Sequence, residues 1–458
     1  MNITAVSSNV LLLDDHRLVS SLQVDGVSLG DFHAYMPTHS YIFAPTREMW
    51  PSTSVNARIP PVIMLSSDGT PRLTKAGDPV VVPANTWLDQ HQPVEQMTWT
   101  PGKPMLVRNQ LVADGGWIKR DGMTCFNLYR PPNIEPGDPD KANRWIGHVR
   151  RVYGDDADHI IQWLAQRVQR PDIKVNHALV LGGEQGIGKD TILEPIKYAI
   201  GAWNFTEVSP KQMLGRFNGV AQSVVLRINE ARDLGEFDRF AFYDHSKVYT
   251  ATPPDVLRVD EKNLREHPVF NVCGVILTTN HKLDGIYLPS DDRRHFVAWS
   301  ELTKDSFEPD YWTELYGWYE REGNRHVAAY LADLDLSGFN PKAPPPKTAA
   351  FWAIVDANRA SEDAELADIL DAMGNPEATT IIRMLGYAKD SDIIDWLKDR
   401  KNRRAIPHRL EKCGYVPVRN DTAISTLWVI NGKRQVIYGR KDLSERDRYR
   451  AASRLTRT

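Results

Sequence analysis

The sequence predicts a mixed α/β fold with a β-rich N-terminal region, a helical segment before the core and a C-terminal winged-helix-like domain. Three observations lead to this prediction. Between about residues 175 and 300, strand-like runs alternate with longer helix-like stretches, which is typical of a parallel or mixed sheet covered by helices. Residues 1–140 are rich in Pro, Thr and Val and lack helical periodicity, which favours short strands. Residues 376–458 place helices before two strand-like runs.

The chain has 458 residues, enough for two to four domains, and its 41% hydrophobic and 25% charged residues are typical of a globular protein. No apolar run is long enough to span a membrane, and the N-terminus lacks the basic flank of a signal peptide. Three widely separated cysteines cannot form a disulfide framework, which indicates a reducing compartment. We therefore expect a cytoplasmic protein that does not contact a membrane.

Shifts in composition divide the chain into five parts. The short apolar runs 60–65 and 79–83 predict strands in the first part, and apolar residues three and four apart predict helices from Ala142 onward. A Pro-rich stretch follows the α/β core, and an acidic helix follows that stretch. The predicted parts are a β-rich region of unknown role at 1–140, a helical segment at 141–174, the core at 175–340, a Pro-rich linker and helix at 341–375, and a basic domain at 376–458.

The charge of the chain is unevenly distributed. Residues 401–458 contain 15 Lys and Arg against 5 Asp and Glu, a net charge of +10, although the whole chain carries −3. The first 400 residues therefore carry −13. A basic end on an acidic body is a common feature of nucleic-acid binding, and a solvated tail without a partner is the alternative.

The run GEQGIGKDT, which stands between a buried-type strand, HALVLG, and a helical run, ILEPIKYAI, predicts a phosphate-binding loop, and a Gly-rich turn that happens to fit the pattern is the alternative. Its glycines let backbone N–H groups turn toward phosphates, and the following helix N-terminus adds a favourable dipole. Lys189 is placed to neutralise the β- and γ-phosphates. The residues predicted to hold the nucleotide are Gly183, Glu184, Gln185, Gly186, Ile187, Gly188, Lys189, Asp190 and Thr191.

The residue after the lysine departs from the usual pattern, in which a Ser or Thr hydroxyl at that position ligates Mg²⁺. Asp190 stands there, and Thr191 comes next. A carboxylate is an acceptable ligand for a hard cation, so either residue can serve the metal. The sequence leaves both possibilities open.

A second strand-like run, SVVLRINEAR, follows about 35 residues later and ends in polar residues. Glu230 is the candidate that orients or deprotonates the attacking water, and Asn229 occupies a place where a second carboxylate is common. An amide can hold a metal-bound water but adds no charge, so the metal affinity is expected to be reduced. The candidate metal site is therefore Asp190, Thr191, Asn229 and Glu230.

The run GVILTTN ends in Asn280, whose amide is expected beside the γ-phosphate. Eleven residues further on, SDDRRHFV contains Arg293 and Arg294. One of them is a candidate arginine finger for the nucleotide of a neighbouring subunit. The alternative is a pair of surface arginines that bridge Asp291 and Asp292.

Two segments are candidates for contact with DNA. The charged run PPDVLRVDEKNLREHPV carries Lys262 and lies between two core strands, and a solvated loop is its alternative. KNRRAIPHRLEKCGY is a candidate recognition helix, and Asn431–Gly432 predicts a hairpin between TLWVI and RQVIY. The candidate DNA-binding residues are Lys262, Arg403, Arg404, Arg409, Lys433 and Arg434.

Taken in order, the phosphate loop, the strand ending in Glu, the charged segment, the strand ending in Thr-Thr-Asn and the Arg-Arg pair resemble the superfamily 3 helicases. The closer resemblance is to the primase-associated helicase domain of bacteriophage and prophage replication proteins. The flanking runs CFNLYRPP, NRWIGHV and IIQWLAQRVQRPDIK are similar to the segment that precedes the ATPase in those proteins. The resemblance covers roughly residues 120–350.

This resemblance implies an AAA+-type P-loop ATPase that uses ATP and Mg²⁺ and works as a homohexameric ring on single-stranded DNA. It implies catalytic roles for Lys189, Glu230, Asn280 and Arg293 or Arg294, and a channel contact for Lys262. The expected function is therefore an ATP-dependent replicative DNA helicase in a bacterial host cytoplasm, with any primase or polymerase on another protein. The alternatives are an initiator or loader that does not unwind, a small-molecule kinase, and a DNA-binding module with a degenerate nucleotide site.

Overall fold

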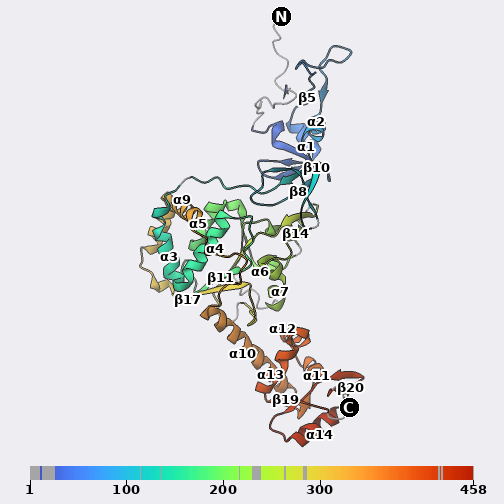
Figure 1. Ribbon diagram of the computed structural model, residues 1–458, viewed down its shortest axis with the longest axis vertical. Helices are drawn as coiled ribbons and strands as arrows, with labels where there is room; N and C mark the ends of the chain where they lie inside the picture. Colours follow the sequence, from blue (N-terminus) through green and yellow to red (C-terminus); the bar gives the residue numbers. More distant parts are fainter. Residues whose placement is uncertain are drawn as a thin grey trace.

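The computed structural model shows an elongated molecule in which three parts follow one another along the long axis (Figure 1). The β-rich N-terminal part lies at one end, the α/β core lies in the middle, and the long helix α10 leads to the C-terminal part. The structure describes residues 11–12, 26–113, 115–135, 137–215, 217–229, 239–262, 265–281, 286–420, 423 and 426–456. Within these residues no helix is long and apolar enough to cross a membrane.

The N-terminal part contains the short strands that its composition predicts. Strands at Val62–Ile63 and Val81–Val82 confirm the predictions for 60–65 and 79–83. Three small sheets have the strand orders β4-β3-β2-β7, β8-β10-β9 and β1-β5-β6. Their strands are β1 (Leu11–Leu12), β2 (Phe32–Tyr35), β3 (Ser40–Phe43), β4 (Glu48–Trp50), β5 (Val62–Ile63), β6 (Val81–Val82), β7 (Pro93–Val94), β8 (Gln96–Thr98), β9 (Leu106–Ala113) and β10 (Gly116–Asn127).

Two short helices also occur in this part, α1 (Ser52–Arg58) and α2 (Ala84–His91), where the sequence predicts only strands and loops. They have 7 and 8 residues, about two turns each, which is too short for a helical period to stand out. Both pack against β2 and β3 around buried Val55 and Leu88. Tertiary packing rather than periodicity therefore sets these helices.

The predicted helical segment before the core is confirmed as α3 (Asn143–Tyr153) and α4 (Ala157–Gln169). The core itself is a five-stranded sheet in the order β12-β13-β16-β11-β17, and every neighbouring pair is parallel. The strands are β11 (Ala178–Gly183), β12 (Phe205–Val208), β13 (Val225–Ile228), β16 (Gly274–Thr279) and β17 (His295–Ser300). A parallel sheet places the carboxyl ends of all five strands at one edge, and the phosphate loop lies at that edge.

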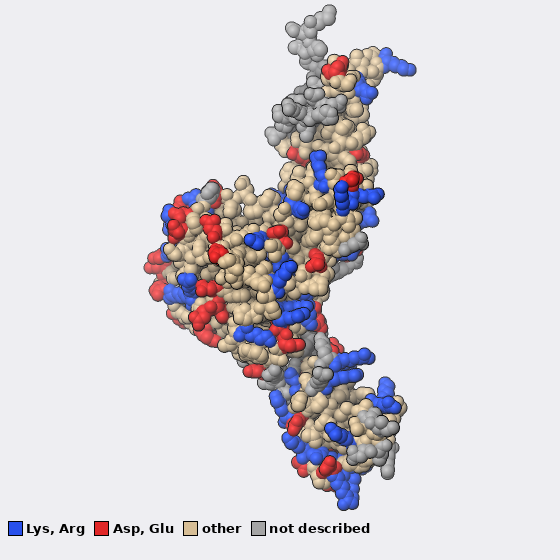
Figure 2. Space-filling view, viewed as in Figure 1, with Lys and Arg blue, Asp and Glu red and all other residues tan. Residues whose placement is uncertain are grey.

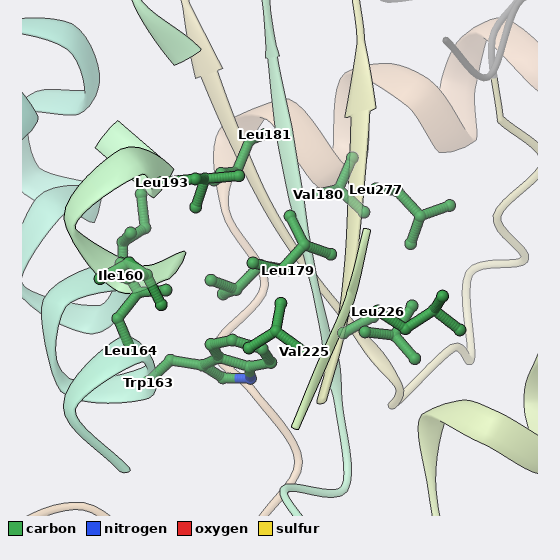
Figure 3. Packing of buried hydrophobic residues seen from close by; sticks show 14 of the residues in the cluster. Ile160, Trp163, Leu164, Leu179, Val180, Leu181, Leu193, Val225, Leu226 and Leu277 are labelled. Carbon is green, nitrogen blue, oxygen red and sulfur yellow. The ribbon is translucent and has the colours of Figure 1, made fainter. Parts of the chain in front are cut away.

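Helices cover both faces of this sheet (Figure 1). Figure 3 shows alternate residues of β11 pointing to opposite faces, with Leu179 and Leu181 toward α4 and α5 and Val180 toward the other side. Trp163 of α4 is fully buried beneath the sheet. The remaining helices of the core are α5 (Lys189–Ile200), α6 (Pro210–Met213), α7 (Arg239–Thr250), α8 (Tyr311–Trp318) and α9 (Asn324–Asp333).

The charged segment between β13 and β16 forms an antiparallel hairpin of β14 (Val256–Val259) and β15 (His267–Phe270). The N-terminal part packs directly against it. The Thr98 hydroxyl donates a hydrogen bond to the Pro268 carbonyl at 2.9 Å, and the rings of Trp117 and Phe270 stack with their centres 5.3 Å apart. The hairpin is therefore attached to both the core sheet and the N-terminal sheets.

Helix α10 (Ala349–Ala372) belongs to two hydrophobic cores. Its first turns bury Phe351 and Ile354 against the central core, and its last turns bury Leu366 and Leu370 in the core of the C-terminal part. The hydroxyl of Thr348 caps the helix and also donates to the Val297 carbonyl of β17 at 2.6 Å. The helix predicted near 348–373 thus forms as one continuous connection.

In the C-terminal part, helices precede a hairpin as predicted, but the second hairpin strand is divided. The turn at Asn431–Gly432 joins Trp428–Ile430 to Lys433–Gln435, and the next strand, Ile437–Arg440, pairs with β18 and β19 instead. The helix expected over 401–415 is an α-helix only from Ala405. The elements are β18 (Ala378–Thr379), α11 (Ile381–Leu385), α12 (Ser391–Lys398), α13 (Ala405–Lys412), β19 (Tyr415–Val418), β20 (Trp428–Ile430), β21 (Lys433–Gln435), β22 (Ile437–Arg440) and α14 (Glu445–Leu455).

Candidate nucleotide-binding site

The loop between β11 and α5 has the backbone shape that a phosphate cradle requires. Gly186 and Gly188 both have φ of +86°, in the left-handed region that glycine adopts without strain. A Cβ at Gly188 would lie only 2.6 Å from the His148 ring and from the Trp312 ring. Glycine is therefore required at Gly188 both by its backbone angle and by its neighbours.

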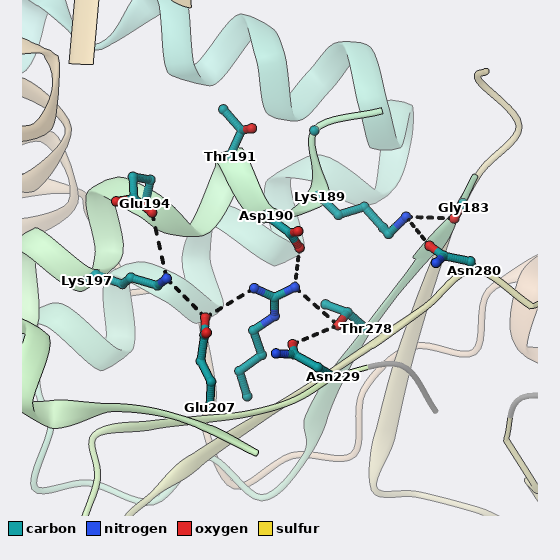
Figure 4. Close-up of polar contacts among 12 residues, drawn as sticks. Gly183, Lys189, Asp190, Thr191, Glu194, Lys197, Glu207, Asn229, Thr278 and Asn280 are labelled. Atoms are coloured by element: carbon teal, nitrogen blue, oxygen red, sulfur yellow. Dashed lines mark hydrogen bonds and ion pairs between the residues drawn. The ribbon is translucent and has the colours of Figure 1, made fainter. Parts of the chain in front are cut away.

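Lys189 and Asn280, which the sequence predicts in one site, meet at the head of this loop (Figure 4). The Lys189 ammonium donates to the Asn280 side-chain oxygen and to the carbonyls of Gly183 and Glu184, each at 2.7 Å. Burial lowers the pKa of Lys189 to about 8. The end of β16 thus delivers a polar group to the lysine of the phosphate loop.

Asp190 forms an ion pair with Arg227, a residue of β13 that the sequence analysis did not single out. The Asp190 side chain is 74% exposed, whereas that of Arg227 is only 9% exposed. Arg227 also donates to the Glu207 carboxylate of β12 at 3.2 Å and to the Thr278 hydroxyl at 3.4 Å. Although burial opposes the shift, Lys197 and Arg227 lower the pKa of Glu207. Asp190 is therefore part of a charged network that lines the cavity.

The predicted metal ligands lie in different surroundings. Asn229 lies at the end of β13, where its side-chain oxygen accepts a hydrogen bond from Thr278 at 3.3 Å. Thr191 instead faces α8, with its hydroxyl 2.8 Å from the hydroxyl of Tyr316. Glu230 lies outside the described residues. Asp190 and Asn229 supply oxygen donors beside the phosphate loop, which suits Mg²⁺ because this ion takes few protein ligands, phosphate oxygens and water.

A cavity of about 810 Å³ opens over the loop. Its lining includes Asn229 and Asn280 and the aromatic residues Trp312 and Tyr316 of α8. The two aromatic residues are four positions apart, so they lie on one face of the helix. Gln185, Gly186, Gly188, Lys189, Asp190 and Thr191 of the predicted loop also line the cavity.

His148 of α3 supports the loop from the outside. One ring nitrogen lies 3.2 Å from the Gly188 carbonyl, and the other lies 2.8 Å from the Tyr311 hydroxyl. Burial lowers the pKa of His148 to about 4, so its ring is neutral near pH 7. The helix before the core and α8 therefore both hold the phosphate loop in place.

Arg293 and Arg294 lie at the opposite edge of the sheet from this cavity. Strands β11 and β17 pair in parallel from Ala178–His295 to Gly183–Ser300, so the two arginines precede the amino end of β17. At about 3.3 Å per residue, the two edges are roughly 17 Å apart. Neither arginine can therefore reach the phosphate loop of its own chain.

The predicted bridging of Asp292 by these arginine side chains is not what the structure shows. The Asp292 carboxylate accepts hydrogen bonds from the Tyr243 hydroxyl at 2.8 Å and from the backbone N–H groups of Arg294 and His295. It also contacts the His295 ring. Asp292 therefore fixes the start of β17 through the backbone, while the Arg293 side chain is exposed.

The predicted DNA-binding residues are spread over two parts of the molecule. Lys262 is exposed in the loop of the β14–β15 hairpin, and Arg403, Lys433 and Arg434 are exposed in the C-terminal part. Arg409 is partly buried, with its guanidinium 4.8 Å from the Trp396 ring centre. The side chain of Arg404 lies outside the described residues.

Sequence reasoning missed Arg227, Glu207 and the aromatic pair on α8. Arg227 leaves a signal in the sequence, because a single charged residue inside the apolar run SVVLRIN must find a partner when the strand is buried. Trp312 and Tyr316 leave none, since aromatic residues four apart in a helix are typical of an ordinary core face.

Residues 181–294 match a protein family described as a family of unknown function (DUF5906). A DNA primase-polymerase from Nitratiruptor phage NrS-1 is 21% identical over 201 residues, which cover 43% of this chain and 27% of that protein. The chain thus spans about a quarter of the length of this relative.

An apo structure of the NrS-1 C-terminal region superposes with a TM-score of 0.53 at 15% identity, covering 89% of this chain and 96% of that one. A second apo structure of the region gives a TM-score of 0.52 at 15% identity, covering 89% and 95% of the two chains. The present chain is therefore similar in fold to that region of a phage replication protein.

Proposed function

We propose that this protein is a phage-type, ATP-dependent replicative DNA helicase that works as a hexameric ring on single-stranded DNA. The observation that carries the proposal is the 2.7 Å hydrogen bond from Lys189 to Asn280 at the head of the cavity. A phosphate loop and the polar ends of two further parallel strands meet there, as the chemistry of a triphosphate requires. The similarity to a phage DNA primase-polymerase supports a place in DNA replication.

In this proposal the residues of the cavity divide the work of ATP hydrolysis. The loop N–H groups and Lys189 bind the β- and γ-phosphates, and Asn280 contacts the γ-phosphate. Asp190 and Asn229 hold Mg²⁺, which neutralises phosphate charge when it is bound. Glu230 orients the attacking water.

Two parts of the molecule present exposed Lys and Arg side chains to the phosphate backbone of DNA. The β14–β15 hairpin presents Lys262 and, next to it, exposed Arg265. The C-terminal part shows mostly Lys and Arg side chains on the face seen in Figure 2, whereas acidic side chains intermix with basic ones over the central part. Contacts of this kind give an affinity that falls steeply with salt concentration.

The position of Arg293 and Arg294 supports assembly. Because neither reaches its own cavity, each is available to the cavity of a neighbouring subunit. A head-to-tail arrangement that closes on itself gives a ring, and we propose six subunits. A separate primase or polymerase is the proposed partner.

The first test is ATP hydrolysis by the purified protein with and without a single-stranded oligonucleotide. We expect DNA to stimulate hydrolysis, and we expect Lys189→Ala to lower kcat at least about 100-fold because the γ-phosphate loses its cation. Glu230→Gln should also abolish turnover while nucleotide still binds. Lys141→Ala, which removes an exposed lysine paired with Asp138, is the matched control and should hydrolyse normally.

A Lys189→Ala variant that hydrolyses ATP at the wild-type rate would contradict the proposed site. A strand-displacement assay then separates the helicase from its rivals. ATP hydrolysis without displacement indicates an initiator or loader, and DNA binding without hydrolysis indicates a module with a degenerate nucleotide site.

A further inference from the structure

Arg227 occupies a position in the cavity that its sequence neighbours do not explain. It lies between Leu226 and Ile228, both fully buried, yet its guanidinium reaches the cavity lining. Its Nε is buried without a hydrogen-bond partner among the described residues. Burial of a guanidinium is costly unless charged partners compensate, so the contacts of Arg227 must offset that cost.

The contacts of Arg227 converge on the residue that departs from the usual phosphate loop. Its guanidinium joins Asp190 of the loop, Glu207 of β12 and Thr278 of β16 (Figure 4). Lys197 shares Glu207 at 3.0 Å. The terminal nitrogens of one arginine therefore connect the start of α5 to β12 and β16, the strands on either side of β13.

A carboxylate beside a phosphate loop creates an electrostatic problem. The loop attracts a triphosphate through Lys189 and its N–H groups, and a nearby unpaired negative charge would repel that ligand. A neutral Ser or Thr hydroxyl avoids this repulsion. Most of the Asp190 side chain faces solvent, so its charge would act on a ligand in the cavity. The guanidinium of Arg227 is the cation that pairs with this charge.

We propose that Arg227 is a positioning residue of the nucleotide site, which neutralises Asp190 and holds its carboxylate against β13. In this arrangement one carboxylate oxygen remains available to Mg²⁺, while the charge that would repel a triphosphate is cancelled. Asp190 and Arg227 together replace the single hydroxyl of the usual loop. This inference rests on the proposed binding of ATP and deepens it.

The test is a double-mutant cycle on nucleotide binding, measured with a fluorescent ATP analogue on the full chain. We expect Arg227→Met to weaken binding about 10- to 100-fold in the presence of Mg²⁺, because Asp190 is left unpaired. Asp190→Asn removes that charge, so the Asp190→Asn/Arg227→Met double variant should bind within about threefold of Asp190→Asn alone. Asp190→Ser should tolerate the loss of Arg227 in the same way.

Two further measurements separate a positioning role from a structural one. The Mg²⁺ concentration for half-maximal binding should rise in Arg227→Lys, since a lysine cannot reach all three partners at once. Arg325→Met is the matched control. Arg325 lies on helix α9 and also pairs with two carboxylates, those of Glu135, at 3.3 Å, and Glu322. This variant should leave nucleotide binding unchanged.

The outcomes are distinct. If the double variant binds as weakly as Arg227→Met, Arg227 acts through the fold alone and the inference is overturned. If Arg227→Met binds like the wild type, the inference is also overturned. Wild-type protein that binds no ATP overturns both this inference and the proposed function, whereas wild-type binding with a failed rescue overturns only this inference.

Discussion

At the scale of single residues, the lining of the cavity contains two chemically different groups of residues. Lys189 and Asn280, which share a hydrogen bond, form the polar group, whose chemistry suits the terminal phosphates. Thr191, two residues further along the chain than Lys189, faces Tyr316 on α8, and Trp312 lies one turn earlier on the same helix. An aromatic surface is a general platform for a nucleobase, so, if the proposed nucleotide binds here, we expect Trp312 and Tyr316 to contact its base.

We therefore expect the loss of the Tyr316 ring to weaken the binding of ATP more than the binding of a ligand without a base. Tyr316→Ala should weaken ATP binding about 5- to 100-fold, since base stacking on an aromatic ring contributes about 1–3 kcal/mol, but should leave the affinity for inorganic tripolyphosphate nearly unchanged. Tyr316 is 46% exposed, so its removal leaves no buried hole. Competition between the two ligands measures the effect.

Tyr316→Phe is the control, because it keeps the ring and removes only the hydroxyl that contacts Thr191. Equal losses for ATP and tripolyphosphate in Tyr316→Ala would show that the residue supports the loop rather than the base.

At the scale of elements, the core strands are well predicted because each is an apolar run between polar ends. HALVLGG, SVVLRIN and GVILTTN all form neighbouring strands of one sheet. Their order in the sheet and the Arg227 network cannot be predicted in this way, because both depend on contacts between strands distant in sequence. The hairpin at Asn431–Gly432 is predicted because its turn is local, whereas the break before Ile437 depends on pairing with β18.

Buried histidines on the elements around the core predict a dependence of stability on pH. Burial lowers the pKa of His148 to about 4 and that of His177 to about 3. His177 lies 3.0 Å from His159, nitrogen to nitrogen, which requires that at least one of the two rings is neutral. Below about pH 6.5 the unfolded chain takes up protons that the folded chain does not, so the free energy of unfolding falls.

The expected loss is about 1.4 kcal/mol per pH unit for each of these histidines between about pH 6.5 and 4. Between pH 7.5 and pH 5 it amounts to about 2 kcal/mol for each, measured by urea unfolding. His148→Gln should make this dependence shallower, and His91→Gln, at an exposed position, should not alter it. Stability that does not change over this range would contradict the prediction.

At the scale of the whole molecule, the placement of Arg293 and Arg294 predicts shared sites. Substitution of the finger arginine by Ala should leave nucleotide binding intact and lower turnover by about 10³ or more. Mixing that variant with Lys189→Ala should restore part of the activity, since some interfaces then pair an intact lysine with an intact arginine. Normal hydrolysis by both the Arg293→Ala and the Arg294→Ala variant would exclude a finger in either position.

The way the parts of the molecule join is beyond what one sequence can predict. The Pro-rich stretch near 340–347 indicates a division, yet α10 begins directly after it and is buried in two cores in turn. Likewise, the role of the N-terminal sheets is not visible in their composition, although they pack against the β14–β15 hairpin. Such contacts depend on surfaces that form only after each part has folded.

Helix α10 has 24 residues, and at about 1.5 Å per residue it is roughly 36 Å long. One end of the helix is anchored on β17 and the other lies inside the C-terminal core, so a tilt of the helix would move the C-terminal part relative to the sheet. A tilt of about 10° at the sheet would carry the far end of the helix through about 6 Å. Small rearrangements at the carboxyl ends of the strands would therefore become displacements of several ångströms in the basic C-terminal part of the molecule.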